Sequence, residues 1–407
     1  MTHRATPKPF IAIACGGTGG HLFPGLAVAE QLVQRGGAVA LLISPKEVDQ
    51  QAVRSAQGME IVTLPAVALQ RGSRLDFVRG CWRSWRAARK QFRSRPPQAV
   101  LAMGGFTAAP PLLAAKCRGA RTYLHESNTI PGRANRWLAR FVDQAFVGFP
   151  SATPRLRARA TTVTGTPVRR AFQRRDPAAC RAALRLDPAL PVVLVMGGSQ
   201  GASGINELVL AAVPRLAASG TNWQWLHLTG PAEVGKVERA YQALGVPAVV
   251  RPFLAEMDLA LGAATVAVSR AGASSLAELA AMRVPALLVP FPHAADNHQL
   301  YNARAFADSG AARLLEQRGA EPDQVAAQLR ELVGDEAVRG RMQAALGPWH
   351  APNAAEQIAE IILRAVAQEA ETATGVCGST TTCGCAGETR GQRRVAPASG
   401  LKTPVIA

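Results

Sequence analysis

The chain has 407 residues, 48% of them hydrophobic and 5% aromatic, and a formal net charge of +18. This length exceeds one typical domain, so we expect two, and no run reaches the ~18 apolar residues that a membrane-spanning helix needs. Residues 1–187 hold 29 Lys and Arg against 9 Asp and Glu, which indicates either an anionic partner or an arginine-rich, solvated surface. Neither a signal peptide nor a C-x-x-C pair is visible, so we expect a reducing compartment and, at most, peripheral membrane contact.

An apolar run at residues 10–14 leads into the glycine-rich sequence of residues 16–21, GGTGGH, and then into a predicted helix. A strand, a glycine turn and a helix in this order are typical of a phosphate-binding site, because glycine lets the backbone approach and the helix N-terminus offers free N–H groups. His21 is then expected at the carboxyl edge of the sheet, where it could act as a general base on a hydroxyl. The alternative is a histidine that merely packs at the helix start.

Strand-length apolar runs alternate with helix-length segments, which predicts parallel α/β sheets. The runs are 39–43, 61–64, 99–103, 121–124 and 161–164, and then 191–196, 223–228, 248–250, 265–268 and 285–289. We therefore predict an N-terminal domain at 8–168, a linker at 169–190, a C-terminal domain at 191–347 and a helical segment at 348–368.

Residues 71–95 form a basic amphipathic stretch in which apolar residues and arginines alternate. Such stretches lie on anionic membranes, with Trp at the headgroup level and Arg on the phosphates. An ordinary helix that covers the sheet with its apolar face is the alternative, and both can hold if only one end is exposed. The predicted membrane contacts are Trp82, Trp85, Arg79, Arg83 and Arg86.

Polar or glycine-rich segments follow several other predicted strands. Residues 103–106 (MGGF) and 125–128 (HESN) each follow a strand and should reach the same crevice as His21. HESN lacks the second histidine of a zinc-protease motif, and Glu126 is a carboxylate that could assist or replace His21 as the base. Arg169, which closes residues 165–169 (GTPVR), is a candidate phosphate ligand or hinge residue.

The C-terminal half opens with a second strand and glycine loop, residues 192–201, and carries two further polar segments. Small residues at 269–278 should open a helix whose N–H groups hold a pyrophosphate, with Glu278 positioned to accept hydrogen bonds from a ribose. The loop at 290–299 contains His293, Asp296 and His298, which are few ligands for a metal, so we favour sugar recognition. No D-x-D pair occurs, which argues for helix dipoles instead of a metal, and we expect no cofactor.

The last segment, 369–407, is rich in Thr, Gly and Ser and lacks periodicity, so we expect disorder. Its cysteines, Cys377, Cys383 and Cys385, lack the paired spacing of a zinc site.

Taken together and in this order, the motifs resemble one enzyme family. The segments GGTGGHLFPGLAVA, MGGF, HESN, GTPVR, GGSQGASGIN, SRAGASSLAEL and PHAADNHQ make residues 10–365 similar to the MurG family of glycosyltransferases, in glycosyltransferase family 28. This resemblance implies a GT-B fold, which is two Rossmann-like domains with parallel sheets facing across a cleft. It also implies an inverting transfer of GlcNAc from UDP-GlcNAc to the MurNAc C4 hydroxyl of undecaprenyl-PP-MurNAc-pentapeptide (lipid I), which gives lipid II for peptidoglycan.

The resemblance further implies roles for individual residues. Thr18, Gly19 and Gly20 would flank the donor sugar and the acceptor diphosphate, with His21 as the base. The expected contacts to UDP-GlcNAc also include Asn128, Arg169, Ser199, Leu254 (through its backbone, to uracil), Gly272, Ala273, Ser274, Ser275, Glu278 and Gln299. The chain departs from the common family pattern at Ser127, Thr166 and His298, where Gln, Asn and Gln are frequent, and the tail after 369 has no counterpart.

The family places the enzyme on the cytoplasmic face of the cell membrane. UDP-GlcNAc, lipid I, the anionic membrane surface and other cell-wall and division proteins are then the expected partners. A UDP-GlcNAc 2-epimerase, which shares the architecture and the donor, is the alternative enzyme, and a non-catalytic nucleotide-sugar-binding protein is the alternative outside catalysis. Nucleic acid is not an expected partner, because the basic half contains no recognisable binding module.

Overall fold

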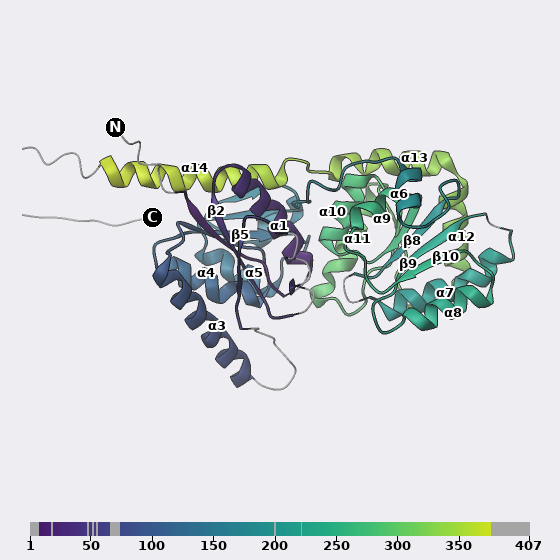
Figure 1. The fold of residues 1–407 in the computed structure, drawn as a ribbon, viewed down its shortest axis with the longest axis horizontal. Coiled ribbons are helices and arrows are strands. Elements are labelled where there is room, and N and C mark those ends of the chain that lie inside the picture. Colours follow the sequence, from purple (N-terminus) through teal and green to yellow (C-terminus); the bar gives the residue numbers. More distant parts are fainter. Residues whose placement is uncertain are drawn as a thin grey trace, which may run out of the picture. The chain divides into compact units, whose positions relative to one another are not determined.

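The computed structural model describes residues 8–17, 19–46, 49–50, 53, 56–65, 74–198, 201–220 and 222–375. Two parallel sheets, separate along the sequence, organise this part of the chain (Figure 1). The prediction of parallel α/β architecture is confirmed.

The N-terminal sheet has seven strands in the order β3-β2-β1-β4-β5-β6-β7, all parallel. The strands are β1 (Phe10–Ala14), β2 (Ala38–Ile43), β3 (Glu60–Thr63), β4 (Ala99–Ala102), β5 (Arg121–Glu126), β6 (Gln144–Val147) and β7 (Thr161–Val163). Alternate residues of β1 point to opposite faces, so Ile11 and Ile13 enter one core while Phe10 and Ala12 enter another. The strand order reverses between β1 and β4, and open sheets bind ligands at such a switch point.

Helices cover both faces of this sheet. The helices α1 (Gly19–Gln34) and α14 (Ala354–Gly375) pack on the face of Ile11, and Ile358 and Ile362 of α14 are fully buried there. The opposite face carries α3 (Arg74–Ser94), α4 (Ala109–Lys116) and α5 (Arg133–Leu138), with the short 3-10 helices η2 (Phe106–Ala108), η3 (Ala139–Phe141) and η4 (Pro150–Arg155) beside them.

The C-terminal sheet has six parallel strands in the order β10-β9-β8-β11-β12-β13, with its own reversal between β8 and β11. They are β8 (Val192–Met196), β9 (Gln224–Leu228), β10 (Ala248–Arg251), β11 (Val266–Ser269), β12 (Ala286–Leu288) and β13 (Arg313–Leu314). The helices of this half are α6 (Pro177–Ala183), α7 (Ser203–Ala217), α8 (Val234–Ala243), α9 (Met257–Ala263), α10 (Ala273–Met282), α11 (His298–Asp308), α12 (Pro322–Gly334) and α13 (Glu336–Ala345), with η5 (Ala295–Asn297) and η6 (Gly347–Trp349).

The structure differs from the predictions in three elements. Strands β6 and β13 were not predicted, because both are short and β6 begins at the polar residue Gln144, directly after Asp143. Helix α14 continues to Gly375, so the expectation of disorder from residue 369 is wrong for 369–375, where alanine and glutamate, both strong helix formers, prolong the helix. Residues 376–407, with Cys377, Cys383 and Cys385, lie outside the described residues. The domain boundaries remain predictions.

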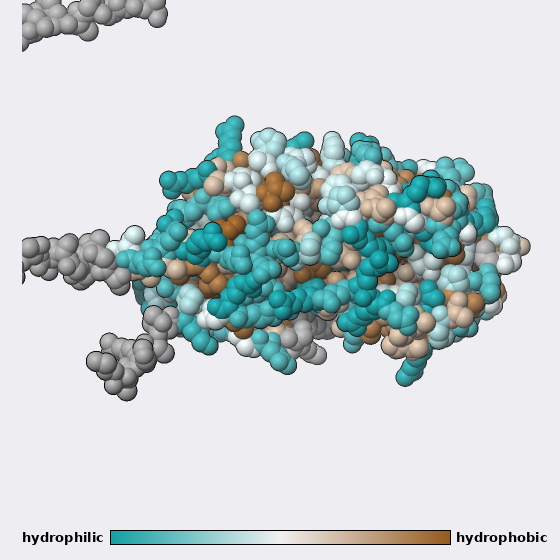
Figure 2. All heavy atoms as spheres, turned by 90° about the horizontal axis from the view of Figure 1, so that it is seen from above, coloured by the Kyte–Doolittle hydropathy of each residue, from teal (hydrophilic) through white to brown (hydrophobic). Residues whose placement is uncertain are grey.

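No helix in the described part of the chain is both long and apolar enough to cross a bilayer. The face shown in Figure 2 is largely hydrophilic, with hydrophobic residues scattered among polar ones. Among the cysteines that the structure describes, Cys15, Cys81, Cys117 and Cys180 are free thiols.

Candidate active site

A pocket of about 1090 Å³ lies where the carboxyl ends of the two sheets meet. Its walls come from the segments that follow β1, β4 and β5 in the N-terminal sheet and β8, β10, β11 and β12 in the C-terminal sheet. Both switch points, the one between β1 and β4 and the one between β8 and β11, therefore open into one space. A pocket at switch points is the expected ligand site of α/β folds.

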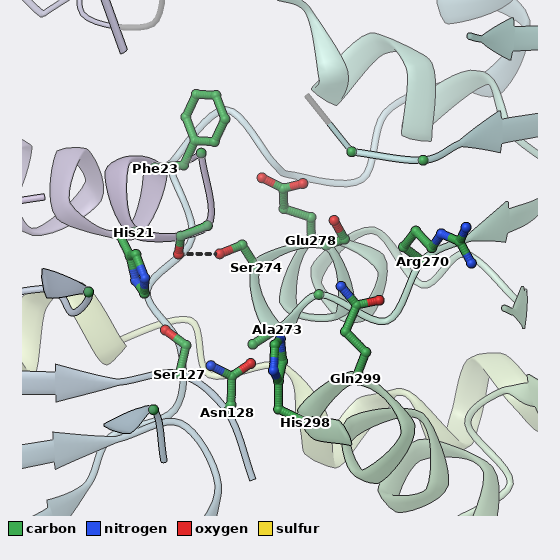
Figure 3. A pocket seen from close by; sticks show the side chains of 18 of the residues that line it. His21, Phe23, Ser127, Asn128, Arg270, Ala273, Ser274, Glu278, His298 and Gln299 are labelled. Atoms are coloured by element: carbon green, nitrogen blue, oxygen red, sulfur yellow. Dashed lines mark hydrogen bonds between the residues drawn. The ribbon is translucent and has the colours of Figure 1, made fainter. Parts of the chain in front are cut away.

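The pocket gathers residues that are far apart in the sequence. Every predicted catalytic or substrate-binding residue that the structure describes lines it: Gly19, Gly20, His21, Glu126, Asn128, Arg169, Leu254, Gly272, Ala273, Ser274, Ser275, Glu278 and Gln299. The predicted contacts Thr18 and Ser199 lie outside the described residues. Figure 3 shows His21, Ser127 and Asn128 on one side of the pocket and Glu278, Arg270 and Gln299 on the other.

His21 sits in the first turn of α1 and packs on the glycine loop that follows β4. A Cβ at Gly104 would lie 2.8 Å from His21 Cε1 and 3.0 Å from Nδ1, and one at Gly105 would lie 3.6 Å from Nε2. Gly104 also has a φ of +117°, which residues with a side chain rarely adopt. Because Gly104 and Gly105 have no side chains, there is room for the imidazole of His21. The segments that follow β1 and β4, on either side of the switch point, together position this candidate base.

Electrostatics favour the neutral form of His21. Burial lowers its pKa from the ordinary value of 6.5, and the nearby Glu126 carboxylate opposes this shift. A neutral imidazole can accept a proton, so the site holds His21 in the state that a general base requires near neutral pH.

Glu126, the second catalytic candidate, is occupied by its own loop. Its Oε1 accepts hydrogen bonds from the backbone N (2.8 Å) and Nδ2 (3.0 Å) of Asn128, and its Oε2 accepts from Gly132 N (2.9 Å) and Asn135 Nδ2 (2.8 Å). Four donors saturate an ionised carboxylate. Glu126 lies in β5 itself and not in a loop after the strand, and its geometry fits a residue that organises the loop at 126–135 better than one that accepts a substrate proton.

His125, next to it, is also a strand residue and is fully buried. Its Nε2 lies 3.2 Å from the Gly165 carbonyl and its Nδ1 lies 3.2 Å from Ser127 Oγ. Burial lowers its pKa to about 4, so the ring is neutral in the folded protein.

The opposite wall is built on the N-terminus of α10. Gly272 is the N-cap residue and supplies no side-chain cap, so the first backbone N–H groups of the helix are available to an anion. Ser274 Oγ donates to the Gly20 carbonyl across the pocket at 2.9 Å, as Figure 3 shows. Two helix N-termini, those of α1 and α10, are thereby held side by side, and their dipoles favour a diphosphate.

Glu278 and Arg169 are two charged residues that line the pocket. Burial raises the pKa of Glu278 to about 7, and the positive charge of Arg169 acts in the opposite direction. The Arg169 guanidinium lies over the rings of Phe23 (4.7 Å) and Phe172 (5.1 Å), contacts that hold it in place at low entropic cost. Its Nε is buried and has no hydrogen-bond partner in the described structure.

Four residues with evident roles around the pocket were not predicted from the sequence. Asp49 accepts a hydrogen bond from Gly17 N at 2.7 Å and so braces the first glycine loop. Arg270 donates to the Val289 carbonyl at 2.9 Å, and burial lowers its pKa to about 10. Asn302 joins the two halves, and His298, which was placed only in a loop favoured for sugar recognition, lines the pocket. Asp49 and Asn302 lie outside every motif, so no local signal separates them from surface polar groups, whereas Arg270 and His298 lie inside the segments SRAGASSLAEL and PHAADNHQ.

The predicted membrane stretch is helix α3, of which residues 71–73 lie outside the described residues. Leu75, Val78 and Trp82 are 71%, 61% and 54% exposed, and the guanidinium of Arg86 lies 5.3 Å from the centre of the Trp82 ring. Arg79, Arg83 and Arg86 are exposed as well.

Trp85 differs from its neighbours on α3, because it is partly buried and packs against the core beneath the helix, as Ala88 and Phe92 do. The N-terminal part of α3 thus presents an exposed apolar and basic surface, while its C-terminal part covers the sheet.

Among the described residues no group of three or more His, Cys, Asp and Glu is arranged to hold a metal ion. The carboxylate of Asp296 instead pairs with Arg133 (3.0 Å) and Arg136 (2.7 Å) of the N-terminal half.

Comparison with known proteins agrees with this geometry. The glycosyltransferase family 28 N-terminal domain matches residues 11–147, and the family's C-terminal domain matches residues 192–361. The chain belongs to glycosyltransferase family 28.

Curated relatives of this glycosyltransferase carry one common description. Proteins from Anaeromyxobacter dehalogenans strain 2CP-1 (35% identity over 87% of this chain and 92% of the relative) and Synechococcus sp. strain RCC307 (40% over 80% and 88%) are both described as UDP-N-acetylglucosamine--N-acetylmuramyl-(pentapeptide) pyrophosphoryl-undecaprenol N-acetylglucosamine transferases.

Solved structures confirm the predicted GT-B fold. The crystal structure of Acinetobacter baumannii MurG superposes with a TM-score of 0.67 at 26% identity and covers 88% of this chain and 100% of that chain. The calicheamicin glycosyltransferase CalG4 (TM-score 0.60, 19% identity, 89% and 100% covered) and a Listeria monocytogenes protein described as a putative UDP-N-acetylglucosamine 2-epimerase (0.63, 14%, 87% and 95%) share the fold. The fold alone therefore does not separate transferase from epimerase.

Proposed function

We propose that this enzyme transfers GlcNAc from UDP-GlcNAc to the C4 hydroxyl of MurNAc in undecaprenyl-PP-MurNAc-pentapeptide and thereby forms lipid II for peptidoglycan. The observation that carries the proposal is the placement of His21, from the N-terminal half, opposite the open N-terminus of α10, from the C-terminal half. A base on one wall and an anion site on the other are what a single displacement of a nucleoside diphosphate needs. The common description of the family 28 relatives supports the same reaction.

In this displacement the C4 oxygen of MurNAc forms a bond to the anomeric carbon of GlcNAc while the bond from that carbon to the UDP oxygen breaks. UDP leaves with the electron pair, the configuration inverts from α to β, and His21 takes the hydroxyl proton. Its depressed pKa keeps the acceptor nitrogen free before the reaction. Positive charge near the leaving diphosphate comes from the helix dipoles and Arg169, so we propose a reaction without a metal cofactor.

The donor is proposed to lie along the C-terminal wall. Residues 272–275 would bind its phosphates through backbone N–H groups, Glu278 would accept hydrogen bonds from the ribose, and Leu254 would contact uracil through its backbone. Gln299 and Asn128 would bind the sugar, each from its own half of the enzyme. Thr18 and Ser199 keep their proposed roles on the grounds of the resemblance.

The exposed end of α3 is proposed to bind the anionic cytoplasmic face of the cell membrane. Its surface combines Leu75, Val78 and Trp82 with arginines, the composition that binds acidic lipid headgroups. Phe77 of α3 contacts Phe106 of η2 with ring centres 5.3 Å apart, and Phe106 lines the pocket. The proposed membrane surface and the proposed acceptor site are thus adjacent, which suits a lipid-linked acceptor.

The deciding experiment supplies the enzyme with radiolabelled UDP-GlcNAc and a lipid I analogue. Label that appears in a lipid II analogue supports the proposal, and His21→Ala should abolish this transfer. The same mixture without acceptor tests the alternative, because a 2-epimerase forms UDP-ManNAc from the donor alone. Formation of UDP-ManNAc with no transfer would refute the transferase. Of the carboxylates that line the pocket, Glu126 and Asp296 are committed to other partners, whereas burial raises the pKa of Glu278 to about 7, so the assay and not the geometry separates the two reactions.

A further inference from the structure

A buried contact between the two halves of the enzyme centres on Asn302 of α11, a residue that no motif marks. Its side chain is completely buried. Its Oδ1 accepts hydrogen bonds from the backbone N and the Oγ1 of Thr129, both at 2.9 Å. Its Nδ2 donates to Asn128 Oδ1 at 3.0 Å and to the Ala271 carbonyl at 3.1 Å. An amide has two lone pairs and two N–H groups for bonding, so every hydrogen-bonding position of Asn302 is used.

These partners come from both walls of the pocket. Thr129 and Asn128 belong to the loop after β5 in the N-terminal half, whereas Ala271 directly precedes the N-cap of α10 and Asn302 follows Gln299 on α11. We call Asn302 with Asn128 and Thr129 the amide junction. An ordinary contact between domains is relatively polar and lets the domains move relative to each other. A buried amide whose hydrogen-bonding positions are all used forms only in one relative position of its partners.

The junction also sets the orientation of Asn128, which faces the pocket. Asn128 Oδ1 accepts a hydrogen bond from Asn302 Nδ2, and Asn128 Nδ2 donates a hydrogen bond to Glu126 Oε1 at 3.0 Å. The amide of Asn128 therefore cannot flip, and one N–H of its Nδ2 remains for a ligand in the pocket. A change in the position of Asn302 would release Asn128 from this orientation.

Resting on the proposed transfer reaction, we propose that Asn302 is a positioning residue that couples occupancy of the donor wall to the orientation of Asn128 on the opposite wall. A nucleotide bound at α10 reduces the motion of Ala271 and α11. The hydrogen bonds of Asn302 to Thr129 and Asn128 then reduce the motion of the loop at 126–132. Asn302 itself touches neither substrate. Because coupling between two sites is reciprocal, weakening the junction lowers turnover and also weakens nucleotide binding, by the factor by which the nucleotide steadies the loop.

A matched pair of variants tests the proposal with little disturbance to folding. Thr129→Val keeps the shape and removes the hydroxyl that donates to Asn302, while Thr129→Ser keeps the hydroxyl. Because loss of one buried neutral hydrogen bond is worth about a 3- to 10-fold change, we expect kcat of Thr129→Val to fall by about that factor. Thr129→Ser should stay within about twofold of wild type in kcat. The dissociation constant of UDP, measured by calorimetry, should rise in Thr129→Val, by no more than kcat falls, and should stay within about twofold in Thr129→Ser.

A double-mutant cycle separates positioning from general damage. If Asn302 acts through Asn128, then in an Asn128→Ala background Thr129→Val should change kcat by less than about twofold. An equal loss in both backgrounds, or equal kcat for Thr129→Val and Thr129→Ser, would overturn the proposal.

Hydrogen exchange gives a readout that does not depend on transfer. UDP should slow amide exchange in the segment 126–132 of wild type and Thr129→Ser, and should slow it less in Thr129→Val. Equal slowing in all three proteins, or none in wild type, would refute the coupling. If wild type shows this pattern but transfers no GlcNAc to the lipid I analogue, the proposed reaction fails and the junction stands.

Discussion

Replacing Gly104 by alanine tests whether the loop after β4 positions the base. The new Cβ would lie 2.8 Å from His21 Cε1 and 3.0 Å from Nδ1, while unstrained carbon contacts begin at about 3.5 Å. The imidazole must therefore move by roughly half an ångström to one ångström. Displacement of a reacting group by about 1 Å costs up to about 100-fold in rate, so we expect kcat of Gly104→Ala to fall 10- to 100-fold.

Backbone strain has to be separated from this displacement, because Gly104 has a φ of +117°. Gly119 is a matched control: its φ is +82° and a Cβ there would meet nothing within 4 Å. Both alanine variants should lose roughly 1 kcal/mol or more of unfolding free energy, since alanine at positive φ is strained. Only Gly104→Ala should lose activity.

The assay is the initial rate of GlcNAc transfer to a lipid I analogue at saturating UDP-GlcNAc, with the unfolding free energy measured by urea denaturation of each variant. Wild-type kcat in a folded Gly104→Ala protein would refute the idea that this glycine places the base. Equal loss of kcat in Gly119→Ala would show that strain, and not the position of His21, limits the rate.

Three further predictions concern pH and the membrane. The acid limb of the kcat/KM profile should have its midpoint below pH 6.5, because burial lowers the pKa of His21 and the reaction needs the unprotonated ring; a midpoint above 6.5 would contradict this. Glu278→Gln should weaken donor binding yet stabilise the protein, because a carboxyl with a pKa of about 7 makes folding less favourable as pH rises from 4.5 to 7. The gain, measured by urea denaturation, should be about 1 to 3 kcal/mol at pH 8 and close to zero at pH 4, and a gain independent of pH would contradict the shift. Trp82→Ala should reduce partitioning onto anionic vesicles by about 10-fold, whereas Leu244→Ala, exposed on the C-terminal half, should leave it unchanged; equal partitioning of both variants would exclude α3 as the contact.

The agreement between sequence and structure is best where the signal is local. The loop at 16–21 and the segment at 269–278 were predicted from glycines and small residues that follow apolar runs, and residues 19–21 of the first and six residues of the second line the pocket. The buried strands appear in the sequence as continuous apolar runs, because helices cover both faces of a parallel sheet. The exceptions are elements too short to show a pattern, such as β13, and the end of α14, where helix-forming residues continue past the packed part.

Residue roles that depend on partners far along the chain were harder to predict. Trp85 and Trp82 lie three residues apart in one basic stretch, yet only Trp82 is exposed, because the sheet covers one side of α3. Glu126 looked like a spare base, and its four hydrogen-bond donors became apparent only with the loop in place.

The sequence by itself determined the class of fold, the two glycine loops and many of the residues that line the pocket, because strand ends and helix N-termini are made by neighbours in the chain. Only the tertiary structure decided which of them meet. The reversal of strand order between β1 and β4 brings Gly104 under His21, and the contact between the two halves brings Asn302 to Asn128. Such pairs are separated by 83 and 174 positions, and no local pattern records a contact that forms only when two sheets have been assembled.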